Sequence, residues 1–434
     1  MSLEWETKSF SDLVEIIGGG TPKTSKEEYW DGDIPWISIK DFNNDLKHIK
    51  TTEKTITELG LENSSTKILN PGDLIISARG TVGEIAMISS PMAFNQSCYG
   101  LRAYDFVDNG FIYYLLKYNI DKLKNSVHGS VFDTITTNTF NNIIVNVPPI
   151  EIQKKINQIL SNIDKKIELN IELNKNLEEI IKKIYINWFE DFEPFNEEEF
   201  YDTKLGRIPV GWRVEPLQDF IKFQEGPGIR NWQYVEEDGI KFLNIRCIQD
   251  NDLILDSANM ISKEEANGKY SHFMLNEWDI IISSSGTLGR YAIVRKEHLP
   301  LCLNTSIIRF APIHSFEHYS YIYSYLTSRG FYHYLLTMGS GSVQLNFGPT
   351  HLKQIDIIVP PEDVLKRYND LIFPLIESMI NIKSEIDQLI KLRDTLLPKL
   401  MSGEIDVPEI NCDLKITITS LTINAQNYLL EALI

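Results

Sequence analysis

The sequence predicts an α+β protein in which two similar mixed α/β domains are joined by two long antiparallel, coiled-coil-like helices with approximate twofold symmetry. Three observations predict this fold. The chain of 434 residues is too long for one ordinary domain. An internal repeat with a period of roughly 206 to 212 residues runs through it. Each copy of the repeat ends in a long stretch with helical periodicity.

The repeat is most evident around a strand that leads into a Gly-Thr-x-Gly turn. Leu69–Gly83 matches Leu275–Gly289, and both segments are typical of a turn, a buried strand and a second tight turn. Because the period far exceeds 50 residues, each copy is expected to be a complete domain rather than a solenoid unit. Further anchors keep the same order: Trp5 with Trp212, Asn95–Ser97 with Asn304–Ser306, Phe111–Leu116 with Tyr321–Leu326, Gly129–Ser130 with Gly341–Ser342, and Ile143–Pro149 with Ile355–Pro361.

After each Pro-Pro pair, apolar residues recur in three- and four-residue steps over about 38 residues. Such helices would be ~55 Å long. Asn170 interrupts the first apolar stripe, and Pro374 is expected to kink or delay the second helix. A lone helix of this length cannot bury its stripe, so the two helices are expected to pack on each other. The alternative is that each helix folds back on its own domain.

These features divide the chain into five predicted segments. The first domain has only four residues before Trp5, whereas Leu205–Trp212 forms a lead-in to the second domain. We therefore expect the C-terminal tail to contact the first domain and to supply its missing lead-in. The segments are a first domain at 1–150, a helix at 151–192, an acidic linker with the second domain at 193–361, a helix at 362–403 and a tail at 404–434.

Composition limits the class of protein. No apolar run approaches the ~18 residues of a membrane helix, and Met1–Phe10 does not resemble a signal peptide. The four cysteines form no CxxC pair, which indicates reduced thiols in a cytoplasmic protein. His314 and His318 lie four residues apart without a third ligand, which favours a surface pair over a zinc site.

The formal net charge of −18 argues against a protein that simply coats nucleic acid. A DNA-binding chain with this charge must concentrate its basic groups locally, or use positive charge from a partner.

A search for enzyme motifs finds no complete one. Asn146–Ile150 lacks the compact Asn-Pro-Pro-aromatic site of amino-methyltransferases, and Gly18–Pro22 lacks the Gly-Lys-Ser/Thr of a phosphate-binding loop. Glu362 and Asp363 with Lys366 could suggest a nuclease, but helix capping explains these acids better. The Gly-Thr-x-Gly turns are interpreted as tight β-turns, with the alternative that their exposed amides approach a phosphate.

Sequence-specific DNA reading needs polar side chains on exposed loops, with Arg or Lys for phosphates and guanine edges. Such residues cluster beside the repeated turns, and the two halves differ most at these positions. The candidates are Lys23, Lys40, Arg79, Thr81, Gln96, Arg102 and Ser130 in the first half, and Arg230, Asn244, Arg246, Thr287, Arg290, Thr305, Gln344 and Asn346 in the second.

Several longer segments together resemble a known family, the specificity subunits of type I restriction–modification systems. The resemblance covers almost the whole chain. It rests on Ile34–Asp41, the two Gly-Thr-x-Gly turns, Trp188–Phe195, Gly206–Trp212 and Leu396–Ile405.

The resemblance implies two target recognition domains, each reading one half of a bipartite double-stranded DNA site, with the helices setting the spacer. It also implies docking of two methyltransferase (modification) subunits, for which Trp188, Phe189, Leu397 and Leu400 are the candidate contacts. Restriction/translocase subunits would join this core. S-adenosylmethionine, ATP and Mg would then be bound by the partner subunits, so this chain would bind no cofactor or metal and would not be catalytic. The alternatives are a DNA methyltransferase or nuclease of unfamiliar type, and a scaffold that does not bind DNA.

Overall fold

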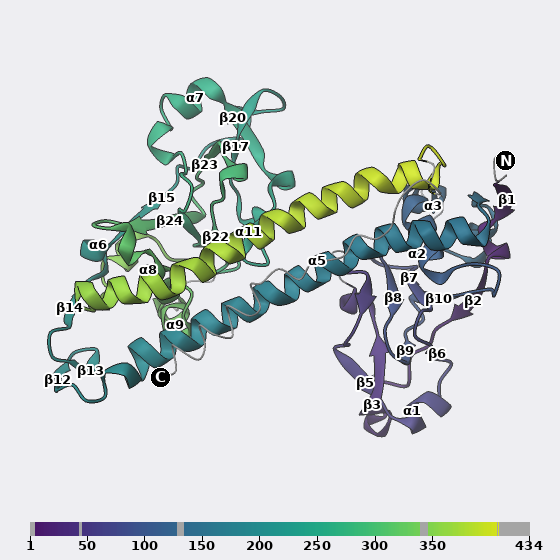
Figure 1. The fold of residues 1–434 in the computed structure, drawn as a ribbon, viewed down its shortest axis with the longest axis horizontal. Coiled ribbons are helices and arrows are strands. Elements are labelled where there is room, and N and C mark those ends of the chain that lie inside the picture. Colours follow the sequence, from purple (N-terminus) through teal and green to yellow (C-terminus); the bar gives the residue numbers. More distant parts are fainter. Residues whose placement is uncertain (1–4, 43–45, 128–133, 339–345, 406, 408–434) are drawn as a thin grey trace. The chain divides into compact units, whose positions relative to one another are not determined.

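A computed structural model describes residues 5–42, 46–127, 134–338, 346–405 and 407 of the chain. These residues form two compact units. The first unit contains the described residues up to Glu172 and those from Ser384 onward, and the second contains Leu173–Lys383. Each unit includes parts of both long helices, α5 (Ile150–Tyr185) and α11 (Glu362–Met401) (Figure 1).

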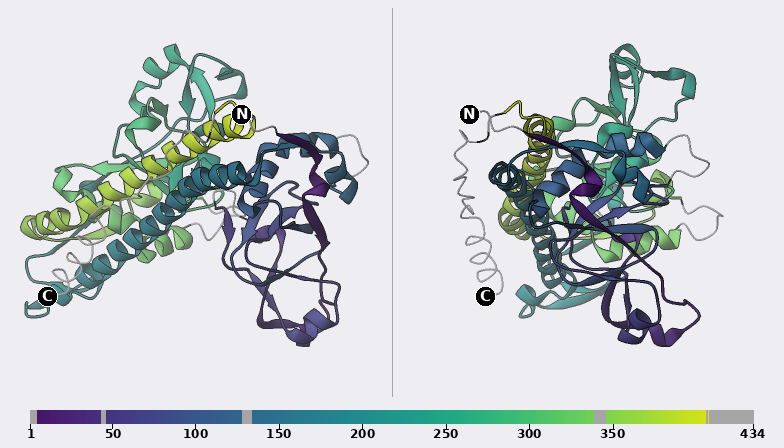
Figure 2. Two further views of the ribbon diagram at one scale, coloured as in Figure 1. Left: turned by 45° about the vertical axis from the view of Figure 1, so that its right-hand side comes forward. Right: turned by 90° about the vertical axis from the view of Figure 1, so that its right-hand side faces the viewer.

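The first unit contains two larger sheets and one short one. Its strands are β1 (Glu6–Ser9), β2 (Val14–Gly18), β3 (Trp30–Ile37), β4 (His48–Ile49), β5 (Lys54–Ile56), β6 (Ile68–Leu69), β7 (Leu74–Ser77), β8 (Ile85–Ile88), β9 (Met92–Phe94), β10 (Cys98–Ala103) and β11 (Ile144–Val147). The sheet orders are β2-β10-β7-β8-β4, β5-β3-β9-β6 and β1-β11. The sheet that holds β3 and β5 lies on the side away from α5 (Figures 1 and 2).

The second unit repeats this arrangement and adds two short hairpins. Its strands are β12 (Phe200–Thr203), β13 (Gly206–Pro209), β14 (Arg213–Pro216), β15 (Ile221–Glu225), β16 (Tyr234–Val235), β17 (Gly239–Phe242), β18 (Ile248–Gln249), β19 (Asp252–Leu253), β20 (Asn259–Ser262), β21 (Ile280–Ser283), β22 (Tyr291–Ile293), β23 (Leu301–Cys302), β24 (Ile307–Pro312) and β25 (Asp356–Val359). The sheet orders are β15-β24-β21-β22, β16-β20-β17-β23 and β14-β25, with hairpins β12-β13 and β18-β19.

The two units share pairing partners as well as strand order. β2-β10-β7-β8 corresponds to β15-β24-β21-β22, and β1-β11 corresponds to β14-β25. A parallel pair recurs too, as β3 with β9 and as β17 with β23, inside sheets that are otherwise antiparallel. The sequence repeat is therefore also a repeat of fold, which confirms the predicted class of two similar α/β domains with long helices. The approximate twofold symmetry stays a prediction.

Short helices cover the sheets, and several begin at side-chain caps. Thr57 accepts a bond from Gly60 at the start of α1, and Ser262 accepts one from Glu265 at the start of α7. Asp108 caps α2, a helix whose core-facing length includes the buried Tyr113 and Tyr114. The helices are α1 (Glu58–Glu62), α2 (Asn109–Tyr118), α3 (Ile120–Val127), α4 (Thr137–Asn141), α6 (Leu217–Phe220), α7 (Lys263–Asn267), α8 (Tyr319–Leu326), α9 (Arg329–Met338) and α10 (Pro349–Leu352).

The two long helices lie where the periodicity predicts them, with somewhat different ends. α5 ends at Tyr185 and continues into a π-helical turn, Ile186–Glu190. α11 runs without a break through Pro374, so the predicted delay at this residue does not occur. The compact units divide the chain differently from the predicted segments, because each unit takes part of α5 and part of α11.

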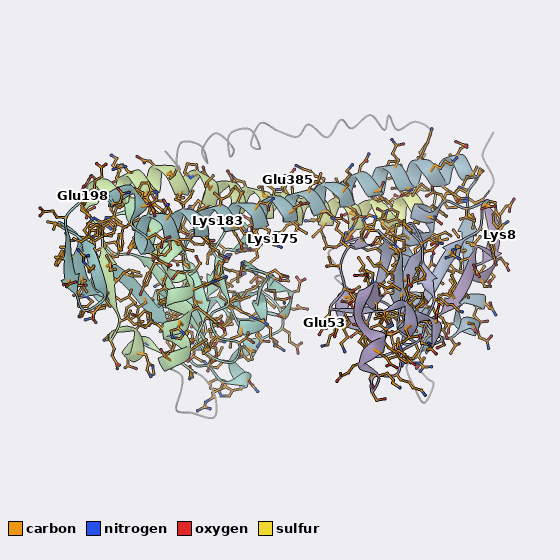
Figure 3. The ribbon with its side chains drawn as sticks, turned by 90° about the horizontal axis from the view of Figure 1, so that it is seen from below. Lys8, Glu53, Lys175, Lys183, Glu198 and Glu385 are labelled. Atoms are coloured by element: carbon orange, nitrogen blue, oxygen red, sulfur yellow. The ribbon has the colours of Figure 1, made fainter. Side chains whose placement is uncertain are left out.

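Within the first unit, the N-terminal part of α5 packs both on its domain and on α11. Ile156 and Leu160 of α5 and Leu400 of α11 belong to one apolar core with Phe10. Polar contacts join the two helices in addition: Asn170 donates to Glu385 (2.9 Å; Glu385 is labelled in Figure 3). Both sequence interpretations, helix on helix and helix on domain, are therefore correct for this unit.

Within the second unit, the π-helical turn that follows α5 packs into a cluster of aromatic rings. Phe189 lies 4.7 Å from Tyr368 of α11 and 4.8 Å from Tyr321 of α8, measured between ring centroids. Trp188 and Trp212 complete the cluster. Trp188 and Phe189, which follow α5, are therefore buried in an aromatic core and are not exposed to solvent.

Three further expectations are settled in the described part of the chain. Ile405 and Val407 pack against the core of the first unit, as expected for the tail, while most of 404–434 lies outside the described residues. Cys98, Cys247 and Cys302 are free thiols. The expected surface pair of histidines is wrong, because His318 is buried. It lies in the 3₁₀ turn before α8, stacks on Phe220 and is hydrogen-bonded to Glu362 at the start of α11 (2.7 Å).

Candidate DNA-recognition loops

The first repeated element of the candidate site is the turn between β7 and β8. Gly80 and Gly83 both have positive φ values, +77° and +89°, which favour glycine. The hydroxyl of Ser77 bridges the two ends of the turn, because it donates to the carbonyl of Thr81 and accepts from the amide of Glu84 (2.8 Å). The turn thus presents Thr81 to solvent on a fixed backbone.

The turn between β21 and β22 has the same construction. Gly286 and Gly289 again have positive φ, +68° and +77°. Ser283 donates to the carbonyl of Thr287 (2.6 Å) and accepts from the amide of Arg290 (3.0 Å). The interpretation of Gly-Thr-x-Gly as a tight turn is correct in both units. The serine that holds each turn, Ser77 or Ser283, is not among the residues predicted from the sequence.

A second turn lies beside each of these. In the first unit, Asn95 accepts the amide of Ser97 (3.0 Å), and Ala78 donates to the carbonyl of Ser97 (2.7 Å). In the second, Asn304 accepts the amide of Ser306 (3.2 Å), and Ser284 donates to the carbonyl of Ser306 (2.9 Å). The two turns are therefore hydrogen-bonded into one platform in each unit.

A 3₁₀ turn supplies the third element. Ile39 lies against Gly80, and Ile245 lies against Gly286 at the corresponding place. Each isoleucine is followed by a basic residue, Lys40 in the first unit and Arg246 in the second. We call the exposed ends of these three turns the loop face of each unit, formed by Lys40, Arg79, Thr81 and Gln96 in the first unit and by Arg246, Thr287, Arg290 and Thr305 in the second.

Most predicted DNA-contacting residues are exposed, as that role requires. Lys40 pairs with Glu53 (3.4 Å; Glu53 is labelled in Figure 3), and Gln96 accepts a bond from Thr21. Asn346 bridges to Ser285 of the Gly-Thr-x-Gly segment, which brings it to the loop face. Ser130 and Gln344 lie outside the described residues. The exposed set is Lys23, Lys40, Arg79, Thr81 and Gln96 in the first unit, and Arg230, Arg246, Thr287, Arg290, Thr305 and Asn346 in the second.

Two residues predicted to contact DNA, Arg102 and Asn244, form hydrogen bonds within their own unit. Arg102 donates twice to the buried Asp73 (3.1 and 2.7 Å), and this bond raises the pKa of the guanidinium above its ordinary value. Asn244 is half-buried, accepts the amide of Arg246 (3.0 Å) and donates to the carbonyl of Ser257 (2.9 Å). Both side chains therefore help to build their unit, and their contact with DNA stays a prediction.

The four predicted partner contacts are corrections. Leu397 and Leu400 are buried in the core of the first unit, at 7% and 1% exposure. Trp188 and Phe189 are buried in the aromatic cluster of the second, at 6% and 5%. Helical periodicity identifies the apolar stripe, but here the stripe is covered by the chain's own domains.

The second unit has an open polar hollow beside its Gly-Thr-x-Gly turn, and the residue after that turn differs in charge between the two units. Arg246, Gln249 and Arg290 line an open hollow of about 550 Å³, together with Asp250 and Asn251. Arg290 also donates to the carbonyl of Ile248 (3.3 Å). The residue that follows the turn at the same place in the first unit is Glu84, whose charge is opposite. Two guanidinium groups at one hollow suit a phosphate oxygen.

Neither a metal cluster nor a membrane span is found within the described ranges. No group of three or more His, Cys, Asp or Glu side chains there could hold a metal ion. None of the helices in that part of the chain is long and apolar enough to cross a bilayer.

Comparison with known proteins identifies the family. Residues 2–179 and 209–392 match the type I restriction modification DNA specificity domain. The chain belongs to this family of type I specificity subunits. The MjaIX specificity subunit of Methanocaldococcus jannaschii is 33% identical over 427 residues, which cover 94% of this chain and 95% of that protein. The EcoR124I/EcoR124II specificity subunit of Escherichia coli is 30% identical over 169 residues, which cover 37% of this chain and 41% of that protein.

A solved structure has the same fold. The crystal structure of the type I restriction–modification S subunit from M. genitalium covers 92% of this chain and 96% of its own, with a TM-score of 0.57 at 16% sequence identity. The two specificity-domain matches coincide with the two halves of the repeat. This type I specificity subunit is therefore a DNA-specificity protein with two tandem recognition domains.

Proposed function

We propose that each unit of this subunit reads one half of a bipartite DNA target through its loop face. One observation carries the proposal. The hydrogen-bonded turns are the same in both units, while the exposed side chains that they present differ, as with Gln96 and Thr305. A shared scaffold with different polar ends is what two readers of different half-sites require.

The long helices act as a ruler in this proposal. Half-sites one helical turn apart, ~34 Å, present the same face of the duplex. A protein with two readers can use both only if its connecting helices match that spacing. Because α5 and α11 each extend through both units, their length determines the spacer that separates the half-sites.

The chain is proposed to be the non-catalytic member of its complex. Two modification subunits with S-adenosylmethionine would transfer the methyl group, and restriction/translocase subunits would use ATP and Mg. The net charge of −18 fits such a division, since the partners would supply much of the positive charge around the DNA. We expect weak, salt-sensitive DNA binding by the isolated chain, within a complex that acts in the cytoplasm.

Methylation-sensitive sequencing of DNA from cells that carry this chain and its modification partner tests the proposal. The expected result is a bipartite motif with a fixed unread spacer. The isolated chain should transfer no methyl group in the same assay, whereas activity without a partner would support the rival enzyme. A continuous motif, or no motif with an active partner, would contradict the proposal.

The ruler is tested by lengthening both helices together. Four helix-forming residues would be inserted in α5 after Glu172 and in α11 after Lys383, where the two units divide. Each insertion adds ~6 Å of helix. We expect the spacer to change while the letters of both half-sites stay the same. An insertion of four residues in the exposed linker after Glu197 is the control, and it should leave the spacer unchanged.

A further inference from the structure

The second unit carries an exposed tryptophan in a turn that packs against α7. Trp232 is 81% exposed, more than any other large apolar side chain among the described residues. It lies in a short 3₁₀ turn, Asn231–Gln233, between Arg230 and Tyr234. Arg230 and Asn231 are exposed as well. Leaving an indole in water is unfavourable, because its apolar surface stays hydrated.

The turn is held firmly, so the exposure of the indole is a property of the fold. Gln233 accepts the amide of Arg230 (3.0 Å) and donates to both Glu265 (2.9 Å) and Tyr270 (3.1 Å). Tyr270 is buried in an apolar core against which Ile229 and Tyr234 also pack. Both ends of the turn are thus fixed to the unit, and only the segment between them projects.

The same segment starts at the loop face. A Cβ on Gly226 would lie 2.5 Å from the backbone of Asn304, so the chain passes close to the turn that presents Thr305. Glu225 is hydrogen-bonded to Thr305, which opposes the rise in the pKa of Glu225 caused by burial. Trp232 follows six residues after this contact. The segment that carries Trp232 therefore begins at the loop face.

The first unit has the same turn with different side chains. The amide of Tyr29 donates to the carbonyl of Lys26 (3.1 Å), as that of Gln233 donates to Arg230 (2.9 Å). In this correspondence Trp232 takes the place of Glu28, an exposed acid that pairs with Lys26 (3.4 Å). The fold therefore does not need an aromatic side chain at this position.

We propose that Trp232 is a base-stacking residue, whose indole packs on a base face at an unstacked step in the half-site of the second unit. This inference rests on the proposed function of that unit. Aromatic side chains that stack on bases contribute about 1–3 kcal/mol each, and apolar wedges are known to open base steps. Arg230 and Asn231, which precede Trp232 in the chain, carry the groups that read guanine and adenine edges.

A protein partner is the other occupant to weigh, because exposed Trp and Arg are also typical of protein interfaces. Two copies of one partner, one on each unit, would need similar residues on both. The turns differ in charge and in apolar character, which suits readers of two different half-sites. DNA is therefore the occupant that the comparison of units favours.

The test uses the full chain assembled with its modification partner in cells. Trp232→Ala, Trp232→Phe and the control Val210→Ala are compared by methylation-sensitive sequencing. The control removes an apolar side chain that is 55% exposed elsewhere in the second unit. For Trp232→Ala we expect the preference at one or two positions of one half-site to fall ~5- to ~150-fold, the factor that corresponds to 1–3 kcal/mol. Trp232→Phe should keep most of the preference, and Val210→Ala should keep all of it.

The other half-site serves as an internal control, because its letters and the spacer should not change. Equal loss of methylation at all sites with unchanged letters would overturn the proposal and indicate a protein partner. Unchanged methylation in Trp232→Ala would overturn it too. A wild-type motif that is not bipartite would instead show that the proposed function is wrong, and the inference would fall with it.

Discussion

In the first unit a buried ion pair joins the two long helices, whereas the second unit has isoleucines at the corresponding positions. Arg393 of α11 donates to Asp164 of α5 (3.0 Å), and both side chains are almost fully buried. The repeat relates Asp164 to Ile376 and Arg393 to Ile181, which are buried as well. The helices are thus packed in the second unit without this pair.

The second unit places its buried charge elsewhere. Lys383 of α11 donates to the backbone carbonyl of Asn251, whose side chain donates to Glu178 of α5 (3.1 Å). Burial lowers the pKa of Lys383, while Asp252 and Glu178 oppose the shift. The comparison teaches that the apolar stripe is the common feature of the two units. The buried charges between the long helices differ from unit to unit, so their removal can be tested one unit at a time.

The largest expected effect is the loss of one member of the buried pair in the first unit. Arg393→Met leaves the buried Asp164 carboxylate with the hydrogen bond from Tyr114 but without its ion-pair partner, a loss that costs about 3–5 kcal/mol in comparable cases. The double variant Asp164→Ile with Arg393→Ile copies the second unit and should be less destabilised than the single one. Urea unfolding, followed by hydrogen exchange of first-unit amides, measures both.

Lys399→Met removes a half-exposed charge from the same helix and serves as the control. It should change the free energy of unfolding by no more than about 0.5 kcal/mol. A double variant as unstable as Arg393→Met would contradict the idea that the uncompensated carboxylate causes the loss.

The next effect concerns a buried lysine of the first unit and depends on pH. Lys47 is 5% exposed, donates to Tyr114 (3.2 Å) and lies over its ring. Burial lowers the pKa of Lys47 from 10.5 to about 8. Between these values the unfolded chain binds more protons than the folded one, so the contribution of Lys47 to stability rises with pH.

The variant Lys47→Met has no titrating group at this site. The stability of the wild type relative to this variant should therefore rise by on the order of 3 kcal/mol between pH 7 and pH 10.5. Other groups titrate in both proteins and cancel in the difference. Thermal unfolding across this range measures it. A flat difference would show that the lysine is not desolvated as described.

A smaller effect tests whether the repeated turns are equivalent in energy as well as in geometry. Ser77→Ala and Ser283→Ala each remove a hydroxyl that makes two hydrogen bonds inside a turn. Each variant should lower the free energy of unfolding by about 1–3 kcal/mol, and the two losses should be similar. Hydrogen exchange of the flanking strands in each unit measures the loss. Thr81→Ala and Thr287→Ala alter exposed hydroxyls of the same turns and should cost little.

If the two serine variants lose different amounts of stability, the two turns differ in energy although their geometry is the same. Loss in the unit that was not mutated would contradict their independence. Both outcomes can be distinguished, because hydrogen exchange reports local stability separately for each part of the chain.

The sequence predicts the repeated parts of this fold because their signals are local. A Gly-Thr-x-Gly turn needs positive φ at its glycines, and the values at Gly80 and Gly286 agree. Helical periodicity likewise predicts α5 and α11, since each apolar step reports the backbone of its own segment. Exposure of loop residues such as Thr81 follows from the turn itself.

The sequence does not predict contacts between residues that are distant along the chain. The salt bridge of Arg102 with Asp73 is one such contact. Leu397 is another case, because the sequence shows its helix face but not the apolar core, shared with Phe10, that buries it. Trp232 is not among the predicted contacts, because the repeat has no aromatic residue there. The Gly226–Gly228 segment and Arg230 that precede it are the sequence signals beside this residue.

The smallest expected effect compares the basic residues that follow the isoleucines of the two 3₁₀ turns. Arg246 lines a polar hollow with Arg290, whereas Lys40 is paired with Glu53 (3.4 Å). If Arg246 contacts a phosphate, Arg246→Ala should weaken DNA binding by the assembled complex about equally for all sequences. It should also reduce the slope of log affinity against log salt by about one. Lys40→Ala should reduce it less, because Glu53 already offsets part of the charge. Titrations from low to moderate salt measure both slopes. A changed half-site letter in Arg246→Ala would instead assign Arg246 to a base edge, and equal slopes would show that the two loop faces hold the DNA backbone alike.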